Sequence, residues 1–402
     1  MFSNKTASAL VTIVALALMI VACGTPAAQT AAPVVQTVVV KETAAPVVQT
    51  AVVVQTAVPQ IVTTTPGPQG PAAGSLAING AGATFPFPLY SRWFYDYAFV
   101  DPSVKFNYQS IGSGGGIAQI TAETVDFGAS DAILNNDQYS KAPGIQMFPT
   151  VAGAVVPAYN LLGDDGKPIT AILNLPSAAI ADIFLAKITK WNAPVLQQAN
   201  PEVKLPNKDI VVVHRSDGSG TTYIFTDYLS KISPEWKDKV GNATSVKWPT
   251  GLGGKGNEGV SGLVAQNDGA IGYVELAYAV TNKLPYAVPQ NKAGKYIDPG
   301  KGPEGVQSAM NDFSTDLGDK LAVSIVNAPG EGSYPIAGYT YLLLYMDQQD
   351  CLKARKLVTF MNWALTDGTK DATDLQYVPL PDNVKKLVLD KAAKISCQGK
   401  PL

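Results

Sequence analysis

The chain has 402 residues, of which 46% are hydrophobic and 15% are charged, and its formal net charge is -2 at pH 7. This length accommodates two domains of ordinary size. The charge balance excludes the usual nucleic-acid-binding protein, which carries a basic face. The single histidine, His214, and only three cysteines argue against a zinc or iron–sulfur site, so we expect no metal and no other cofactor.

Residues 1–22 have the pattern of an export signal. Lys5 precedes an uncharged apolar run at residues 9–21, which is short for a membrane span but has the length of a signal-peptide core. The run ends in Ile-Val-Ala before Cys23, which resembles the lipobox of bacterial lipoproteins. We therefore expect an extracytoplasmic protein, in the periplasm or on the cell surface, with Cys23 lipidated and anchored to the cell membrane. The alternative is an ordinary secretory signal followed by an accidental cysteine.

The two other cysteines, Cys351 and Cys397, lie near the C-terminal end. If Cys23 carries a lipid, these two form an even pair in a compartment that permits disulfides. The sequence leaves two alternatives open, a Cys351–Cys397 disulfide or two unpaired thiols.

Residues 23–74 are of low complexity and rich in Ala, Pro, Val, Gln and Thr. Residues 31–37 recur as residues 44–50, and residues 51–56 are a degenerate third copy. A segment without aromatic residues or helical periodicity cannot build a core, so we predict an extended tether. The alternative is a β-rich, self-associating segment, because valine runs favour strands.

From residue 76 onwards, strand patterns alternate with helical patterns. Strands are predicted at residues 76–79, 105–109 and 209–214, and helices from about residue 88, at 117–124 and at 223–231. Such alternation implies an α/β architecture with largely parallel sheets. In sheets of this kind, ligands bind beyond the carboxyl ends of the strands.

The segment from His214 to Thr222 carries the strongest functional signal. It contains Arg215, Asp217, two glycines and four small hydroxyl residues, just before a predicted helix. Backbone N–H groups at a helix start favour anions, hydroxyls add donors, and a guanidinium matches the geometry of phosphate or carboxylate. The whole chain has only three arginines, so Arg215 is not one of many interchangeable surface charges. The segment predicts an oxyanion site.

Three further loops have a similar composition. Residues 80–86 include Thr84, residues 112–116 include Ser113, and residues 126–131 end in Asp131. Each loop alone is typical of a tight turn, and Asp131 alone is typical of a helix cap. Since all of them follow predicted strands, together they indicate one site.

Several longer motifs resemble the substrate-binding protein of the bacterial phosphate ABC importer. The resemblance covers the chain from about residue 76 to the C-terminus. The matching segments are residues 80–86, 125–131, 215–221, 247–249, 251–257 and 269–275.

This resemblance implies a two-lobed periplasmic-binding-protein fold of the α/β class, each lobe a mixed or parallel sheet flanked by helices, with the ligand in the cleft. The first lobe would comprise residues 75–157 and 335–402, and the second lobe residues 158–334. The crossover strands would lie near residues 155–160 and 334–340.

The resemblance also implies the role of each matching residue. Asp131 would accept the proton that phosphate retains near neutral pH and that sulfate lacks, which discriminates between the two anions. Asp217 would orient Arg215, and His214 would be a neighbour without ligand contact. The phosphate contacts would come from Thr84, Phe85, Ser113, Asp131, Arg215, Ser219, Gly220 and Thr221.

The expected function is high-affinity capture of inorganic phosphate by a monomer and its delivery to the membrane permease of an ABC importer, without chemical turnover. One alternative is a surface phosphate sensor or adhesion protein. Another is a phosphoryl-transfer enzyme with Ser219 as nucleophile, for which the sequence offers no obvious base. Within the binding class, arsenate is an alternative ligand.

Overall fold

A computed structural model of the chain describes residues 74–314 and 317–402. They belong to one compact unit spanning Thr64–Leu402. The predicted signal, Cys23 and residues 23–73 of the tether lie outside the described residues. No helix within 74–314 and 317–402 is both long and apolar enough to cross a membrane.

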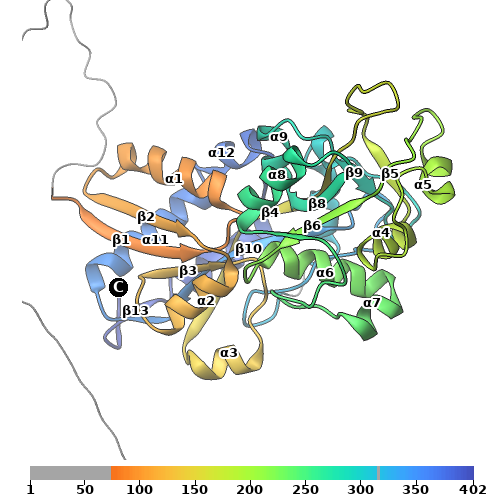
Figure 1. Cartoon of the computed structure of the whole chain (residues 1–402). Coiled ribbons are helices and arrows are strands. Elements are labelled where there is room, and N and C mark those ends of the chain that lie inside the picture. The colour runs from red at the N-terminus through yellow and green to blue at the C-terminus, as the bar shows by residue number, and fades with distance from the viewer. Residues whose placement is uncertain (1–73, 315–316) are drawn as a thin grey trace, which may run out of the picture. The chain divides into compact units, whose positions relative to one another are not determined.

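One nine-stranded sheet runs through the structure, with eight strands on a single path and a ninth paired off it, and strand β4 (Ile145–Asn160) lies near the middle of the path. Residues 145–154 of β4 pair antiparallel with β10, whereas residues 155–160 pair antiparallel with β8. All but the last of its 16 residues are buried, because β4 is covered on both faces. Figure 1 shows β4 and β10 between the two groups of strands.

The strands on one side of this crossover define the first lobe, together with residues 145–154 of β4. Strands β2, β1 and β3 are parallel, and β10 pairs antiparallel with β3. These strands are β1 (Leu76–Gly82), β2 (Val104–Ser110), β3 (Phe127–Ser130), β10 (Ala337–Tyr345) and β12 (Val378–Pro379). Their helices are α1 (Phe87–Val100), α2 (Ser113–Thr121), α3 (Asn136–Lys141), α11 (Cys351–Leu365), α12 (Thr369–Asp374) and α13 (Asp382–Ala392).

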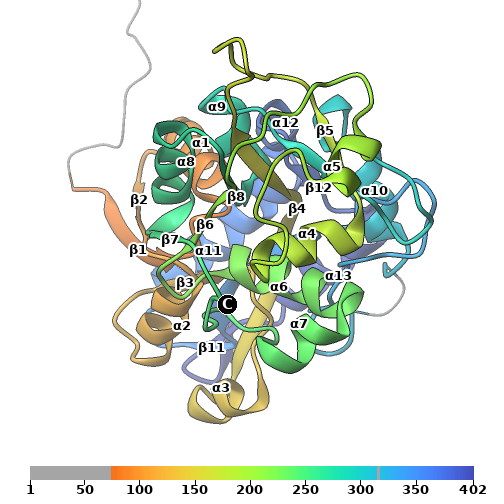
Figure 2. The ribbon, with the colours of Figure 1, turned by 45° about the vertical axis from the view of Figure 1, so that its right-hand side comes forward.

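The second lobe is built on residues 155–160 of β4 and three parallel strands in the order β8, β6, β7. These are β6 (Val211–Arg215), β7 (Leu252–Gly254) and β8 (Ala270–Glu275). Its helices are α4 (Ser177–Phe184), α5 (Pro194–Ala199), α6 (Gly220–Ile232), α7 (Pro234–Lys239), α8 (Gly256–Gln266), α9 (Leu276–Thr281) and α10 (Glu304–Asn311), with a 3-10 turn, η1 (Pro299–Lys301). Helix α8 packs on β6 and β8 (Figures 1 and 2).

Two small sheets complete the fold. Strand β5 (Leu173–Leu175) pairs with β9 (Ala287–Pro289), while β13 (Ser396–Cys397) lies between β11 (Asp347–Gln348) and β14 (Lys400–Pro401). A disulfide joins Cys351 to Cys397 with a Cα–Cα distance of 5.3 Å, so it ties the start of α11 to the last small sheet. The lobe boundaries predicted at residues 157 and 335 stay predictions.

Two helices begin earlier than the sequence predicts. Helix α2 starts at Ser113, not at residue 117, and α6 starts at Gly220, not at residue 223. The prediction was wrong because it assigned every glycine to a loop. Gly112, with φ +86°, makes the turn before α2, while the following glycines occupy the first helical turn. The hydroxyl and glycine residues of both motifs therefore lie at helix N-termini.

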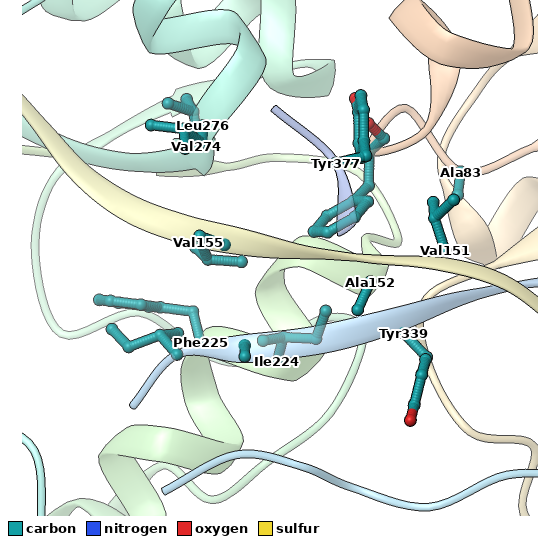
Figure 3. Close-up of a cluster of buried hydrophobic side chains, with 14 of the residues drawn as sticks. Ala83, Val151, Ala152, Val155, Ile224, Phe225, Val274, Leu276, Tyr339 and Tyr377 are labelled. Atoms are coloured by element: carbon teal, nitrogen blue, oxygen red, sulfur yellow. The ribbon is translucent and has the colours of Figure 1, made fainter. Parts of the chain in front are cut away.

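The core continues through both lobes. A Cβ at Gly338 of β10 would lie 2.3 Å from Ile224 Cδ1, so only glycine lets α6 approach the crossover this closely. Figure 3 shows buried side chains of both lobes around β4 and β10. The labelled residues are Ala83, Val151, Ala152, Val155, Ile224, Phe225, Val274, Leu276, Tyr339 and Tyr377.

Candidate anion-binding site

The predicted site residues of both lobes converge where β1, β3 and β6 end. Thr84 and Phe85 lie between β1 and α1, Ser113 begins α2, and Asp131 follows β3. Arg215 ends β6, and the next residues start α6. All eight predicted contact residues are buried, namely Thr84, Phe85, Ser113, Asp131, Arg215, Ser219, Gly220 and Thr221.

Arg215 is paired within the protein. Its Nε and Nη2 donate to Asp217 Oδ1 and Oδ2 at 2.8 and 2.6 Å, and Asp217 Oδ1 also accepts from the Gly256 N–H at 3.0 Å. Burial acts to raise the pKa of Asp217, but the hydrogen bonds and charge of Arg215 outweigh it and leave that pKa below the ordinary value. Much of the arginine charge is thus neutralised before any ligand binds.

The N-terminus of α6 presents unused donors. The Ser219 hydroxyl accepts from the Thr222 N–H at 2.9 Å and caps the helix. Helix geometry leaves the N–H groups of Gly220 and Thr221 without intrahelical acceptors. Since the macrodipole adds positive potential there, this end of α6 suits an anion.

The N-terminus of α2 meets the same loop from the first lobe. The Gly114 N–H donates to the Gly218 carbonyl at 2.9 Å, across the lobes. Ser113 is fully buried, and its hydroxyl accepts from the Asp131 N–H at 3.1 Å. The α2 N-terminus therefore lies directly against the Arg215 loop.

Asp131 is a buried carboxyl group with one free oxygen. Oδ1 accepts from the Thr340 hydroxyl at 2.7 Å, whereas the buried Oδ2 has no hydrogen-bond partner among the described residues. Burial raises the pKa of Asp131 to about 7, although the nearby hydroxyls of Thr340 and Ser113 and the charge of Arg215 act in the opposite direction. Oδ2 faces the start of α6, because a Cβ added to Gly220 would lie 2.4 Å from it. This oxygen can accept a hydrogen bond from a ligand held between the lobes.

Asn257 at the start of α8 is a site residue that the sequence analysis missed. Its Nδ2 donates to the hydroxyls of Thr84 and Thr221, at 2.7 and 3.1 Å. The residue lies in the segment 251–257, which matched the family, but we assigned it no role. The sequence did contain a signal for this role, since Asn257 follows glycines between a strand and a helix, as Ser113 and Thr221 do.

His214 does not join the cluster, in line with the prediction that it is a neighbour. Its ring stacks on Trp248 with centroids 4.9 Å apart, and Nδ1 lies 3.0 Å from the Arg215 carbonyl oxygen. Within 74–314 and 317–402, no hydrogen bond joins Ser219 to a histidine, lysine or carboxylate side chain. The same residues hold no group of three His, Cys, Asp or Glu side chains that could bind a metal.

Comparison with known proteins places these features in a family. Residues 27–368 match the model of the PBP superfamily domain. The chain is 47% identical over 326 residues to the phosphate-binding protein PstS of Xylella fastidiosa, covering 81% of this chain and 87% of the relative. It is 37% identical over 340 residues to the phosphate-binding protein PstS of Methanocaldococcus jannaschii, covering 79% and 85%.

Solved structures support the same fold. A human phosphate binding apolipoprotein superposes with a TM-score of 0.62 at 20% identity, covering 81% of this chain and 99% of that one. A phosphate binding protein from Stenotrophomonas maltophilia gives 0.58 at 19% identity, covering 79% and 94%. The two-lobed α/β fold that the motifs predict is thereby confirmed.

Proposed function

Because the chain belongs to the PBP superfamily and, within it, to the family of the PstS phosphate-binding proteins, we propose that it binds inorganic phosphate outside the cytoplasm and delivers it to the permease of an ABC importer. The proposed contacts are those predicted from the sequence, with Thr84, Phe85, Ser113 and Asp131 on the first lobe. On the second lobe, the proposed contacts come from Arg215, Ser219, Gly220 and Thr221.

The observation that carries this proposal is the free Oδ2 of Asp131 among hydrogen-bond donors. Near neutral pH phosphate retains a proton, so it can donate to this oxygen while its other oxygens accept. Sulfate has no proton to donate, so it would leave the ionised form of Asp131, which prevails as the pH rises above about 7, buried, unpaired and repelled. A buried group that loses its partner can discriminate by roughly 10⁴-fold or more.

Isothermal titration calorimetry with phosphate, sulfate and arsenate, on protein stripped of endogenous ligand, tests this proposal. We expect one phosphate per chain and little response to sulfate. Asp131→Asn should reduce the difference in affinity between phosphate and sulfate. Equal affinity of the parent for phosphate and sulfate would contradict the proposal. Tighter binding of arsenate than of phosphate would identify arsenate as the preferred ligand.

We further propose that Cys23 carries a lipid, that the chain works as a monomer, and that residue 157 and residue 335 mark the lobe boundaries. Incorporation of a labelled fatty acid by the parent, and its loss in Cys23→Ser, would support the anchor. Phosphate uptake in a strain that lacks its own binding protein separates transport from a surface sensor or adhesion role.

The Ser219 hydroxyl caps α6, and in the described part of the chain no basic side chain is hydrogen-bonded to it, which favours binding over phosphoryl transfer. Incubation with a phosphate ester tests this point. We expect stoichiometric binding or none, and no release of phosphate with time.

A further inference from the structure

We propose that Asn257 is a positioning residue of the phosphate site, which turns the hydroxyl protons of Thr84 and Thr221 towards the anion. Thr84 belongs to the first lobe and Thr221 to the second, so one amide would organise donors on both sides. This inference rests on the proposed function and adds to it a residue that does not itself contact the ligand.

Asn257 is fully buried in the first turn of α8, where it contacts both threonines. Its backbone N–H donates to Thr84 Oγ1 at 3.2 Å, and its Nδ2 donates to the same atom at 2.7 Å. The other Nδ2 proton is directed to Thr221 Oγ1 at 3.1 Å. Both side-chain donors are thereby used.

The orientation of the amide group follows from a third contact. Asn257 Oδ1 lies 3.0 Å from the backbone nitrogen of Glu275. A backbone N–H can only donate, so the amide oxygen must face Glu275 and the NH₂ group must face the threonines. Glu275 thus fixes Asn257 in the orientation that donates to both hydroxyls.

The two threonine hydroxyls can consequently act towards a ligand only as hydrogen-bond donors. A threonine hydroxyl has one proton and two acceptor lone pairs. Thr84 Oγ1 accepts twice from Asn257, and Thr221 Oγ1 accepts from Asn257 and from Arg215 Nη1 at 3.3 Å. Among the described residues, neither hydroxyl donates to a protein acceptor. Both protons are free for an anion, and no lone pair of either oxygen is left to repel it.

The test compares Asn257→Ala with the parent by phosphate calorimetry. Without the amide, each hydroxyl can rotate and donate its hydrogen bond to another acceptor, so we expect the phosphate Kd to rise about 10- to 100-fold. Asn267→Ala is the matched control. Asn267 is the C-cap of the same helix and its side chain donates to the Leu263 carbonyl, so this change should leave the Kd within about twofold.

A double-mutant cycle separates positioning from a purely structural role. In a chain that carries Thr84→Val and Thr221→Val, there are no hydroxyl protons to direct, so adding Asn257→Ala should weaken binding less than about threefold. An unchanged 10- to 100-fold loss in that background would overturn the inference. If Asn257→Ala does not fold, Asn257→Asp keeps the shape and accepts in place of donating, and parent-like phosphate affinity in that variant would equally overturn it.

Titration of the parent with phosphate distinguishes failure of the proposed function from failure of the inference about Asn257. A parent that binds no phosphate overturns the proposed function and this inference together. A parent that binds phosphate, with an Asn257→Ala variant of equal affinity, overturns this inference alone.

Discussion

Asp217 and Asp131 show how two aspartates of one site acquire opposite properties from their surroundings. Asp217 is paired bidentately with Arg215, which keeps its pKa low and holds the guanidinium in place. Asp131 has no such partner for Oδ2, and burial raises its pKa to about 7. The first carboxylate balances a fixed charge, and the second leaves one oxygen free to accept a hydrogen bond.

The raised pKa of Asp131 predicts a pH-dependent stability difference. The folded chain holds this proton more tightly than the unfolded chain, whose pKa is near 3.8. The stabilising contribution is therefore fully present below about pH 4 and is lost as the pH rises through about 7. Relative to Asp131→Asn, which does not titrate, the parent should lose up to roughly 4 kcal/mol of unfolding free energy from about pH 4 to about pH 8.

Urea unfolding of both proteins without phosphate, at about pH 4, 6 and 8, measures this difference. Comparing the two chains cancels the titrating groups that do not interact with Asp131. Glu275 is not among them, because burial and the charge of Asp131 both raise its pKa well above the ordinary value. A stability difference that does not change with pH would contradict the raised pKa of Asp131.

At the scale of elements, the site is made from helix N-termini. Helices α2, α6 and α8 all start at it, and each places a small residue in its first turn. Gly220 shows why size matters there, since its Cα lies against Ser113 and Asp131 of the other lobe. The lobes can meet this closely only without a Cβ at that position.

Gly220→Ala should therefore weaken phosphate binding. The new Cβ would lie 2.4 Å from Asp131 Oδ2 and 2.5 Å from Ser113 Oγ, so the lobes must separate or those side chains must move. We expect a rise in phosphate Kd of roughly 10- to 100-fold by calorimetry. Gly262→Ala in α8 is the control, because a Cβ there meets nothing within 4 Å. It should preserve affinity, and equal losses in both variants would exclude the steric explanation.

The disulfide should contribute to stability without affecting the site. It closes a loop between residues 46 apart, and removing such a link typically costs about 2 to 4 kcal/mol. The paired change Cys351→Ala and Cys397→Ala should lower the urea midpoint accordingly and leave the phosphate Kd within about twofold. A large change in affinity would show that this small sheet is coupled to the site.

At the scale of the whole molecule, β4 and β10 join the two lobes, and hydrogen bonds across the site hold them together. Gly114 N–H donates to the Gly218 carbonyl, Asn257 N–H to Thr84 Oγ1, and the Tyr278 hydroxyl to the Thr84 carbonyl at 2.6 Å. All of these must break when the lobes separate. Ligand exchange from a buried site therefore requires them to open and re-form.

Amide hydrogen exchange should detect this opening. Phosphate that favours the closed arrangement should slow exchange at Gly114 and Asn257 by about tenfold or more. The amide of Lys385 donates to the Pro381 carbonyl within the first lobe and serves as the control, since fraying of α13 does not separate the lobes. Equal exchange at Gly114 with and without phosphate would contradict opening as the route of exchange.

The sequence by itself determined the alternation of strands and helices, the loops at the strand ends, and the chemistry of Arg215 and Asp131, because these depend on local composition and on motifs within single segments. Only the tertiary structure decided that α2 and α6 begin inside the glycine motifs, that Asp131 keeps one oxygen free, and that Asn257 donates to both threonines. These features arise from contacts between segments far apart in the sequence, such as Thr84 and Asn257, which are 173 residues apart, and Asp131 and Thr340, which are 209 residues apart. Local patterns do not encode how close two such segments approach, and that distance decides which polar groups find partners.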